Sequence, residues 1–169
     1  MPNTFTLIAS STVGAGGASS IDFTSIPSTY TDLQLFCSLR SAAAVSVGYP
    51  ALKVNGVTTN QSMRTILGTG SAASSGTDTL FEWWASGTSG TASTFTNDSF
   101  YFANYANTSY NKSISKDTVQ ENNGTAAYME MNALLWSSTA AISSLSLYIV
   151  GGANFAQYSS AYLYGVKNA

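Results

Sequence analysis

The sequence predicts an all-β protein that folds as a single, jelly-roll-like β-sandwich domain over residues 1–169. Two observations support this class, and the aromatic content of 12% indicates a folded rather than a disordered chain. Apolar and polar residues alternate in short runs, and clusters of Gly, Asn, Pro and Ser separate the runs. Such alternation indicates strands with one buried face, and closely spaced turn clusters are typical of sandwiches with about eight to ten strands.

The expected strands follow the alternating runs in order along the chain. Each run places one set of side chains on the face that points toward the core. These sets are Phe5, Leu7 and Ala9; Ile21 and Phe23; Leu33, Leu35, Cys37 and Leu39; Leu52 and Val54; Phe81 and Trp83; Phe100 and Phe102; and Leu145, Leu147 and Ile149, before a last strand near residues 155–166. Cys37 lies within such a run, which predicts a small buried apolar side chain rather than a reactive thiol.

Residues 125–136 fit two interpretations. Their Ala, Met and Leu content favours a short helix by propensity. Their alternation favours a strand, which we prefer, with one face formed by Met129, Met131, Ala133 and Leu135.

The segments between the runs predict turns and one loop. The pairs Asn55-Gly56 and Asn123-Gly124 predict two-residue type I′ turns, because both residue types tolerate a positive φ. Residues 68–79 are rich in Gly, Ser and Thr, so we expect a surface loop there.

Charge limits the partners that the chain can have. Charged residues make up 8% of the chain, against roughly 25% in an ordinary soluble domain, and the net charge is −2. Its 6 basic residues are scattered, so neither nucleic acid nor a membrane surface is an expected partner. A charge-poor β protein has little repulsion to keep strand edges and apolar patches apart, which favours a place inside an assembly.

The residue inventory argues against an enzyme. The chain has no histidine and 1 cysteine, so Ser-His-Asp and Cys-His mechanisms and His-containing zinc sites are excluded. Glu82, beside Trp83 and Trp84, is a candidate for sugar hydrolysis, but that chemistry needs a second carboxylate, and a strand position predicts an outward, solvated side chain. We therefore assign no catalytic, cofactor-binding or metal-binding residues.

Exposed aromatic residues are the candidate site. Neighbouring residues of a strand point to opposite faces, so Trp84 cannot share the core with Trp83. Trp84 then forms a subunit or shell contact, packs in a second layer, or stacks on a sugar. Together with Tyr105 and Tyr110, it is expected to be an exposed interface residue.

Several segments resemble a family of small virion structural proteins of tailed bacteriophages. The opening stretch carries most of the resemblance, and shorter segments extend it over nearly the whole chain. The segments are Leu7-Ile8-Ala9-Ser10, Gly16-Gly17-Ala18, Ser20-Ile21-Asp22-Phe23-Thr24-Ser25-Ile26-Pro27, Tyr30-Thr31-Asp32-Leu33, Gly68-Thr69-Gly70-Ser71, Asn111-Lys112-Ser113, Leu135-Trp136-Ser137, Asn154-Phe155 and Leu163-Tyr164-Gly165-Val166-Lys167-Asn168.

The resemblance implies a β-sandwich that is part of the virion and that carries no catalytic residues. It implies a capsid decoration (cement) protein that forms a homo-oligomer, expected to be a trimer, binds the major capsid protein on the outer capsid surface and stabilises the shell. The alternative is a tail fibre or tip adhesin that recognises host-surface glycans. Fibre proteins usually carry an anchor or shaft before the sandwich, whereas the alternation here begins by Phe5, so we expect the decoration protein.

Overall fold

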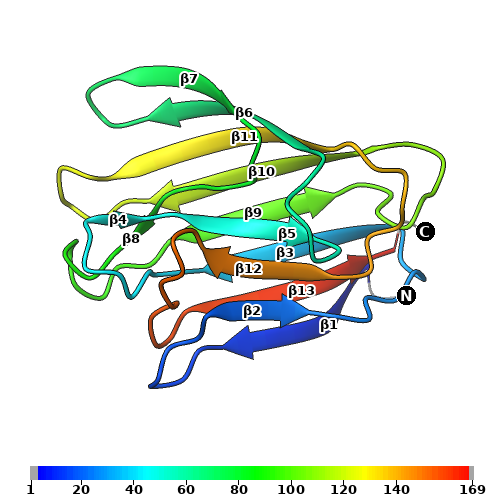
Figure 1. Cartoon of the computed structure of the whole chain (residues 1–169), viewed down its shortest axis with the longest axis horizontal. Helices are drawn as coiled ribbons and strands as arrows, with labels where there is room; N and C mark the ends of the chain where they lie inside the picture. The colour runs from blue at the N-terminus through cyan, green and yellow to red at the C-terminus, as the bar shows by residue number, and fades with distance from the viewer. Residues whose placement is uncertain (1–3, 168–169) are drawn as a thin grey trace.

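The computed structural model describes residues 4–167, and these residues form a β-sandwich without any helix. The predicted all-β class is confirmed. Figure 1 shows the smaller sheet lying in front of part of the large one, with the two ends of the chain close together at one end of the molecule.

The large sheet has eight antiparallel strands. In spatial order they are β1 (Phe5–Thr12), β13 (Ser160–Val166), β3 (Asp32–Ser38), β9 (Asn97–Phe102), β10 (Lys112–Gln120), β11 (Tyr128–Trp136), β6 (Gln61–Gly68) and β7 (Ala73–Asp78). The second layer is a three-stranded sheet of β2 (Ser20–Phe23), β12 (Leu145–Ile149) and β5 (Pro50–Val54). A two-stranded sheet joins β4 (Val47–Gly48) to β8 (Ala85–Ser86).

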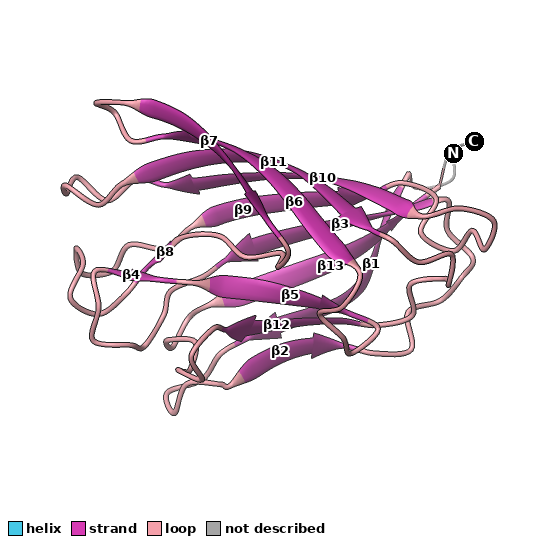
Figure 2. Ribbon diagram, turned by 45° about the horizontal axis from the view of Figure 1, so that its top comes forward, coloured by secondary structure: helices cyan, strands magenta, loops and turns pink. Residues whose placement is uncertain are grey.

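The core lies between the inner faces of the two layers. Most of the residues predicted to face it are buried, among them Leu33, Leu35, Cys37, Leu39, Phe81, Trp83, Leu145 and Leu147. The small sheet covers only part of the large one, and Figure 2 shows β6 and β7 extending beyond it. The opposite, outer face of the large sheet is not covered by any layer of the described chain.

Residues 125–136 contain strand β11, so the choice of a strand over a helix is confirmed. Met129, Met131, Ala133 and Leu135 share one face, as predicted, and this is the outer face of the large sheet. Glu130 and the other alternate residues point into the sandwich.

The prediction that Phe5 and Leu7 face the core is wrong. Both side chains are 51% exposed. Strand β1 is an edge strand whose register shifts between Leu7 and Ala9, so the two sides of this irregularity present different faces of the strand. Leu7 pairs with Tyr164 on the outer face, whereas Ala9 packs against the core.

The prediction of a loop at residues 68–79 is also wrong, because half of this segment forms the edge strand β7. Strand β7 pairs with β6 over its whole length. The turn that connects the two strands is closed by a hydrogen bond from the backbone N–H of Thr69 to the carbonyl of Ala72. Backbone pairing needs no apolar side chains, so a Ser/Gly-rich segment can join a sheet edge without a period-two signal.

The two predicted turns differ in outcome. Asn55 and Gly56 have φ of 51° and 78°, and Val54 and Val57 exchange backbone hydrogen bonds around them, which confirms the two-residue turn. Strands β10 and β11 do form a hairpin, but residues 121–127 connect them, so a two-residue turn at Asn123-Gly124 is wrong.

Candidate functional site

The outer face of the large sheet carries two groups of exposed apolar side chains, at opposite ends of the strand order. The aromatic patch lies on β1, β13 and β3 and consists of the exposed Phe5, Leu7, Phe36 and Tyr162 together with the half-buried Tyr164. The methionine patch lies on β10, β11 and β6 and consists of Ile66, Val119, Met129 and Met131. Large contiguous apolar surfaces of this kind mark interaction sites in soluble proteins.

The aromatic patch is built by cross-strand pairing. Tyr162 stands opposite Phe36, and Leu7 stands opposite Tyr164. The ring of Tyr164 meets Phe36 and Phe5 edge to face, with centroids 6.1 and 6.4 Å apart. Phe5, Phe36 and Tyr164 line a shallow hollow of about 320 Å³, so an incoming apolar group would find pre-ordered rings.

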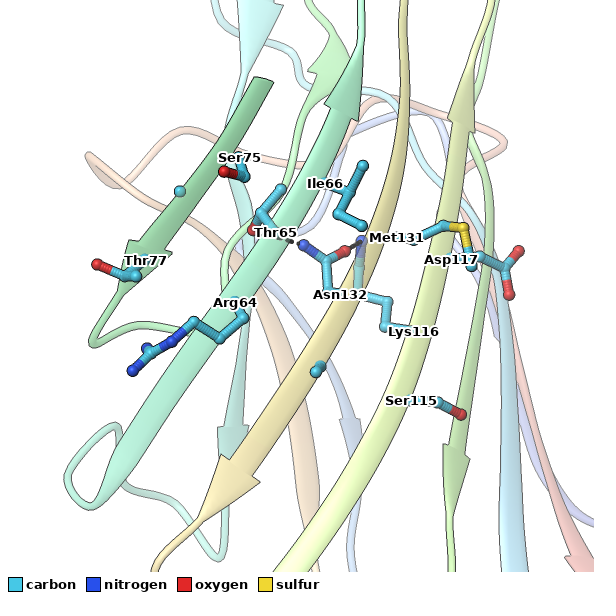
Figure 3. A pocket seen from close by; sticks show the side chains of 12 residues that line it. Arg64, Thr65, Ile66, Ser75, Thr77, Ser115, Lys116, Asp117, Met131 and Asn132 are labelled. Carbon is cyan, nitrogen blue, oxygen red and sulfur yellow. Dashed lines mark hydrogen bonds between the residues drawn. The ribbon is translucent and has the colours of Figure 1, made fainter. Parts of the chain in front are cut away.

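The methionine patch borders a groove of about 720 Å³ on the same outer face, shown in Figure 3. The small residues Ser115 and Ala133 line part of this groove. They stand opposite one another on β10 and β11, and Ala133 is also opposite Arg64 on β6. A second hollow of about 580 Å³ shares these small residues with the first and continues it toward Tyr101.

Two opposite charges flank this groove. Asp117 on β10 and Arg64 on β6 lie on either side of β11, where Asp117 stands opposite Met131 and Arg64 opposite Ala133. Figure 3 shows the two charged groups on opposite sides of Ile66 and Met131. They form no ion pair with one another, and the Arg64 guanidinium donates only to the neighbouring Met63 carbonyl, at 3.1 Å, among the described residues.

Behind the groove, on the inner face of the same strands, lies a buried polar cluster. Lys116 Nζ donates to Asn132 Oδ1 at 3.1 Å and to Thr118 Oγ1, and lies 4.0 Å from Glu130 Oε2. Thr118 in turn donates to Asp98 Oδ1 at 2.9 Å. The ammonium also sits 4.7 Å above the centre of the Trp83 ring.

Burial controls the protonation of this cluster. It raises the pKa of Asp98 to about 6, although Lys116 and hydrogen bonds to the carboxylate oppose the shift. Burial also raises the pKa of Glu130 and lowers that of Lys116, and in each case the opposite charge nearby counteracts it. The cluster links β9, β10 and β11 by side-chain hydrogen bonds, which fixes the strands that carry the methionine patch.

Glu82, the sequence candidate for sugar chemistry, does lie near a second carboxylate. Glu82, Trp84 and Glu130 line a hollow of about 190 Å³ under β7. Burial raises the pKa of both Glu82 and Glu130. Glu130, however, accepts the backbone N–H of Trp84 at 3.2 Å and faces Lys116, so internal groups already engage its carboxylate.

The three predicted interface residues do not form one site. Trp84 is half-buried between Tyr49 and Tyr128, with ring centroids 6.3 and 3.8 Å away, which matches packing in a second layer. Tyr110 is exposed, but it precedes β10 at the end where β10 pairs with Trp136, far along the hairpin from Tyr128.

The expectation that Tyr105 is exposed is wrong, because its side chain is 0% exposed. The hydroxyl donates to the carbonyl of Pro27, and the backbone carbonyl accepts the N–H of Ile142. An aromatic residue just after a strand can fold back over the core, and the sequence pattern carries no signal for this.

Sequence reasoning missed both patches on the outer face. The available signal was that Phe36, Tyr162 and Tyr164 are out of phase with the core residues of their own strands. A strand with apolar residues on both faces indicates either two covered faces or one face reserved for a partner.

Comparison with known protein families and with curated proteins finds no match to the chain. Within residues 4–167, no group of three or more Cys, Asp or Glu side chains is placed to hold a metal ion. The same residues include no helix with the length and apolar character needed to cross a membrane.

Proposed function

We propose that the chain is a non-enzymatic structural protein of a tailed-phage virion that decorates the outer capsid surface. Its partners are the major capsid protein and further copies of the chain. The observation that carries the proposal is the aromatic patch, which a protein acting alone in water has no reason to display on an uncovered sheet face.

The chemistry of the patch suits a lasting contact between proteins. Tyr and Phe rings provide large contact areas at low conformational cost, and they are enriched where interfaces are strongest. Phe36 and Tyr162, each close to 40% exposed, still have much surface to bury. Burial of apolar area contributes about 25 cal/mol per Å² before the costs of association, so a patch that bridges capsid subunits would resist their separation.

The low charge of the chain supports the same proposal. None of the five residues of the patch is charged, so attachment would depend on apolar burial rather than on ion pairs. Interactions between exposed charges weaken with salt, whereas apolar burial persists. We therefore expect capsid attachment to survive high ionic strength.

The proposal can be tested by co-sedimentation with particles that lack the protein. The wild-type chain and a Phe36→Ser/Tyr162→Ser variant are added to such particles, and the bound fraction is measured. We expect the variant to lose most of its binding. Tyr158→Ser is the matched control, because Tyr158 is the most exposed aromatic residue of the described chain and lies outside the patch.

Undiminished binding by the double variant would contradict the proposed surface. Melting curves of all three proteins show whether any loss of binding is only a loss of folding. Absence of wild-type binding to the particles would contradict capsid attachment itself.

The second candidate function is that of a tail fibre or tip adhesin that binds host-surface glycans. The groove favours it, because Ser75, Thr77 and Ser115 line it together with Arg64 and Asp117, and such groups hydrogen-bond sugar hydroxyls. A glycan array separates the two functions, since only the adhesin should retain specific sugars.

A further inference from the structure

The methionine patch holds the most exposed apolar side chains on the large sheet. Ile66, Met131 and Met129 are 63%, 59% and 57% exposed. They lie on the neighbouring strands β6 and β11, and Val119 extends the patch onto β10 opposite Met129. Met side chains are flexible and polarizable, so they adapt to irregular partner surfaces.

The charges beside this patch are arranged for self-pairing. Asp117 lies on β10, the neighbour of β11 on one side, and Arg64 lies on β6, its neighbour on the other side. Consider a second copy that faces the first, related by a two-fold axis that lies in the interface over β11, midway between the two charges. This operation places Arg64 of each copy against Asp117 of the other and brings Ile66 and Met131 of the two copies together, because these two side chains lie between the charges.

From this self-complementarity we infer that the methionine patch is the surface through which two copies of the chain pack face to face. Each pair would contain two equivalent Arg64–Asp117 contacts, one on each side of the axis. Between them the apolar residues of the two copies would be buried together, as in a hydrophobic interface core with a charged rim.

A second copy fits this surface better than a glycan does. The side chains that stand highest on it, Ile66 and Met131, are aliphatic, and no exposed Trp or Phe platform for a sugar ring lies among the groove residues. A pair of opposite charges separated by an apolar strip suits an isologous interface, because each copy then offers both halves of every charge contact.

The inference rests on the homo-oligomer that forms part of the proposed function and names its surface. It specifies a two-fold pair, whereas the family resemblance implies a trimer. The test uses purified protein without any particle. Its failure therefore leaves capsid attachment through the aromatic patch untouched, and failure of capsid attachment leaves the pair untouched.

The experiment is charge reversal in trans, followed by sedimentation equilibrium. Arg64→Asp alone places two carboxylates at each contact, and Asp117→Arg alone places two guanidinium groups there. We expect each variant alone to associate about a hundredfold more weakly than the wild type, since facing like charges are strongly unfavourable. An equimolar mixture of the two variants should recover a pair that contains one copy of each, because both of its contacts are again opposite in charge.

Recovery of association in the mixture cannot come from a change within one chain, because each variant alone should fail to pair. Glu121→Arg, at an exposed position outside the patch, is the charge-reversal control and should leave wild-type association unchanged. Melting curves confirm that each variant is folded.

Four results would overturn the inference: a wild-type chain that stays monomeric, association that survives both single reversals, a mixture that remains unpaired, or a three-copy complex. If the wild type is monomeric and binds a glycan that Arg64→Asp no longer binds, the groove is a glycan-binding site instead of a contact between two copies.

Discussion

Lys116 and Glu130 form an ion pair inside the sandwich, with Nζ 4.0 Å from Oε2 and with only 1% and 2% of their side chains exposed. They lie on the neighbouring strands β10 and β11, directly behind the groove of the outer face. A buried charge is tolerated only when it is paired and hydrogen-bonded. For Lys116, Glu130 provides the opposite charge, and Asn132 and Thr118 accept hydrogen bonds from its ammonium group.

Replacing Lys116 by Met should destabilise the fold by about 3–5 kcal/mol, because it leaves the carboxylates of Asp98 and Glu130 buried without a cation. Urea unfolding measures the change. Lys53→Met is the control: Lys53 is half-buried over the ring of Tyr148, and its removal should change the free energy of unfolding by less than about 1 kcal/mol. Equal effects of the two substitutions would contradict the role given to the buried cluster.

The raised pKa of Asp98 should make the stability of the fold depend on pH. Burial raises its pKa to about 6, so the folded state holds this proton more tightly than the unfolded chain, where the carboxyl titrates near about 3.9. The contribution of Asp98 to stability therefore falls as pH rises from about 4 to about 6, by at most about 1.4 kcal/mol per pH unit. The raised pKa of Glu130 acts in the same direction.

An Asp98→Asn variant should show a shallower loss of unfolding free energy across that pH range. Glu121→Gln, which changes an exposed carboxylate, should keep the wild-type slope. Unfolding in urea at several pH values provides the comparison, and an unchanged slope in Asp98→Asn would show that Asp98 is not the titrating group.

Arg40 should not be replaceable by lysine. Its buried guanidinium donates to the carbonyls of Thr91 at 2.7 Å, Thr94 at 2.8 Å and Gly87 at 2.7 Å, which holds residues 87–94 in place. An ammonium group cannot reproduce this planar fork. Arg40→Lys should lower stability by about 2–4 kcal/mol and speed proteolysis of residues 87–94. The exposed Arg64→Lys should do neither.

Leu35 and Leu7 distinguish the two faces of the large sheet. Leu35→Ala should destabilise the fold by about 2–5 kcal/mol, since its side chain is completely buried. Leu7→Ala, at a half-exposed position on the outer face, should change the free energy of unfolding by no more than about 0.5 kcal/mol. The reverse order in a denaturant titration would contradict the assigned faces.

The sequence predicted the fold class and the core well, because period-two alternation directly reports which face of a strand is buried. The core run from Leu33 to Leu39 and the strand over Met129–Leu135 follow from this rule. The alternation rule failed at Leu7, where a register irregularity changes the exposed face, and at β7, where backbone pairing alone forms the strand.

The candidate surface was harder to predict, because exposure of an aromatic residue depends on what covers it. Tyr105 occupies a polar stretch of sequence and is nevertheless buried, whereas Phe36 lies within a core strand and is exposed. The buried cluster is similarly hidden from sequence, since Lys116, Asp98 and Glu130 come from three strands that meet only in the folded sheet.

Attachment of the protein to the outer capsid surface can be tested by electron cryomicroscopy of reconstituted particles. Tailed-phage particles that lack this protein are imaged with and without added wild-type chain. We expect additional density, shaped as this sandwich, repeated over the whole shell at symmetry-related positions, with the aromatic patch against the capsid. Density confined to the tail, or no added density on the shell, would contradict it.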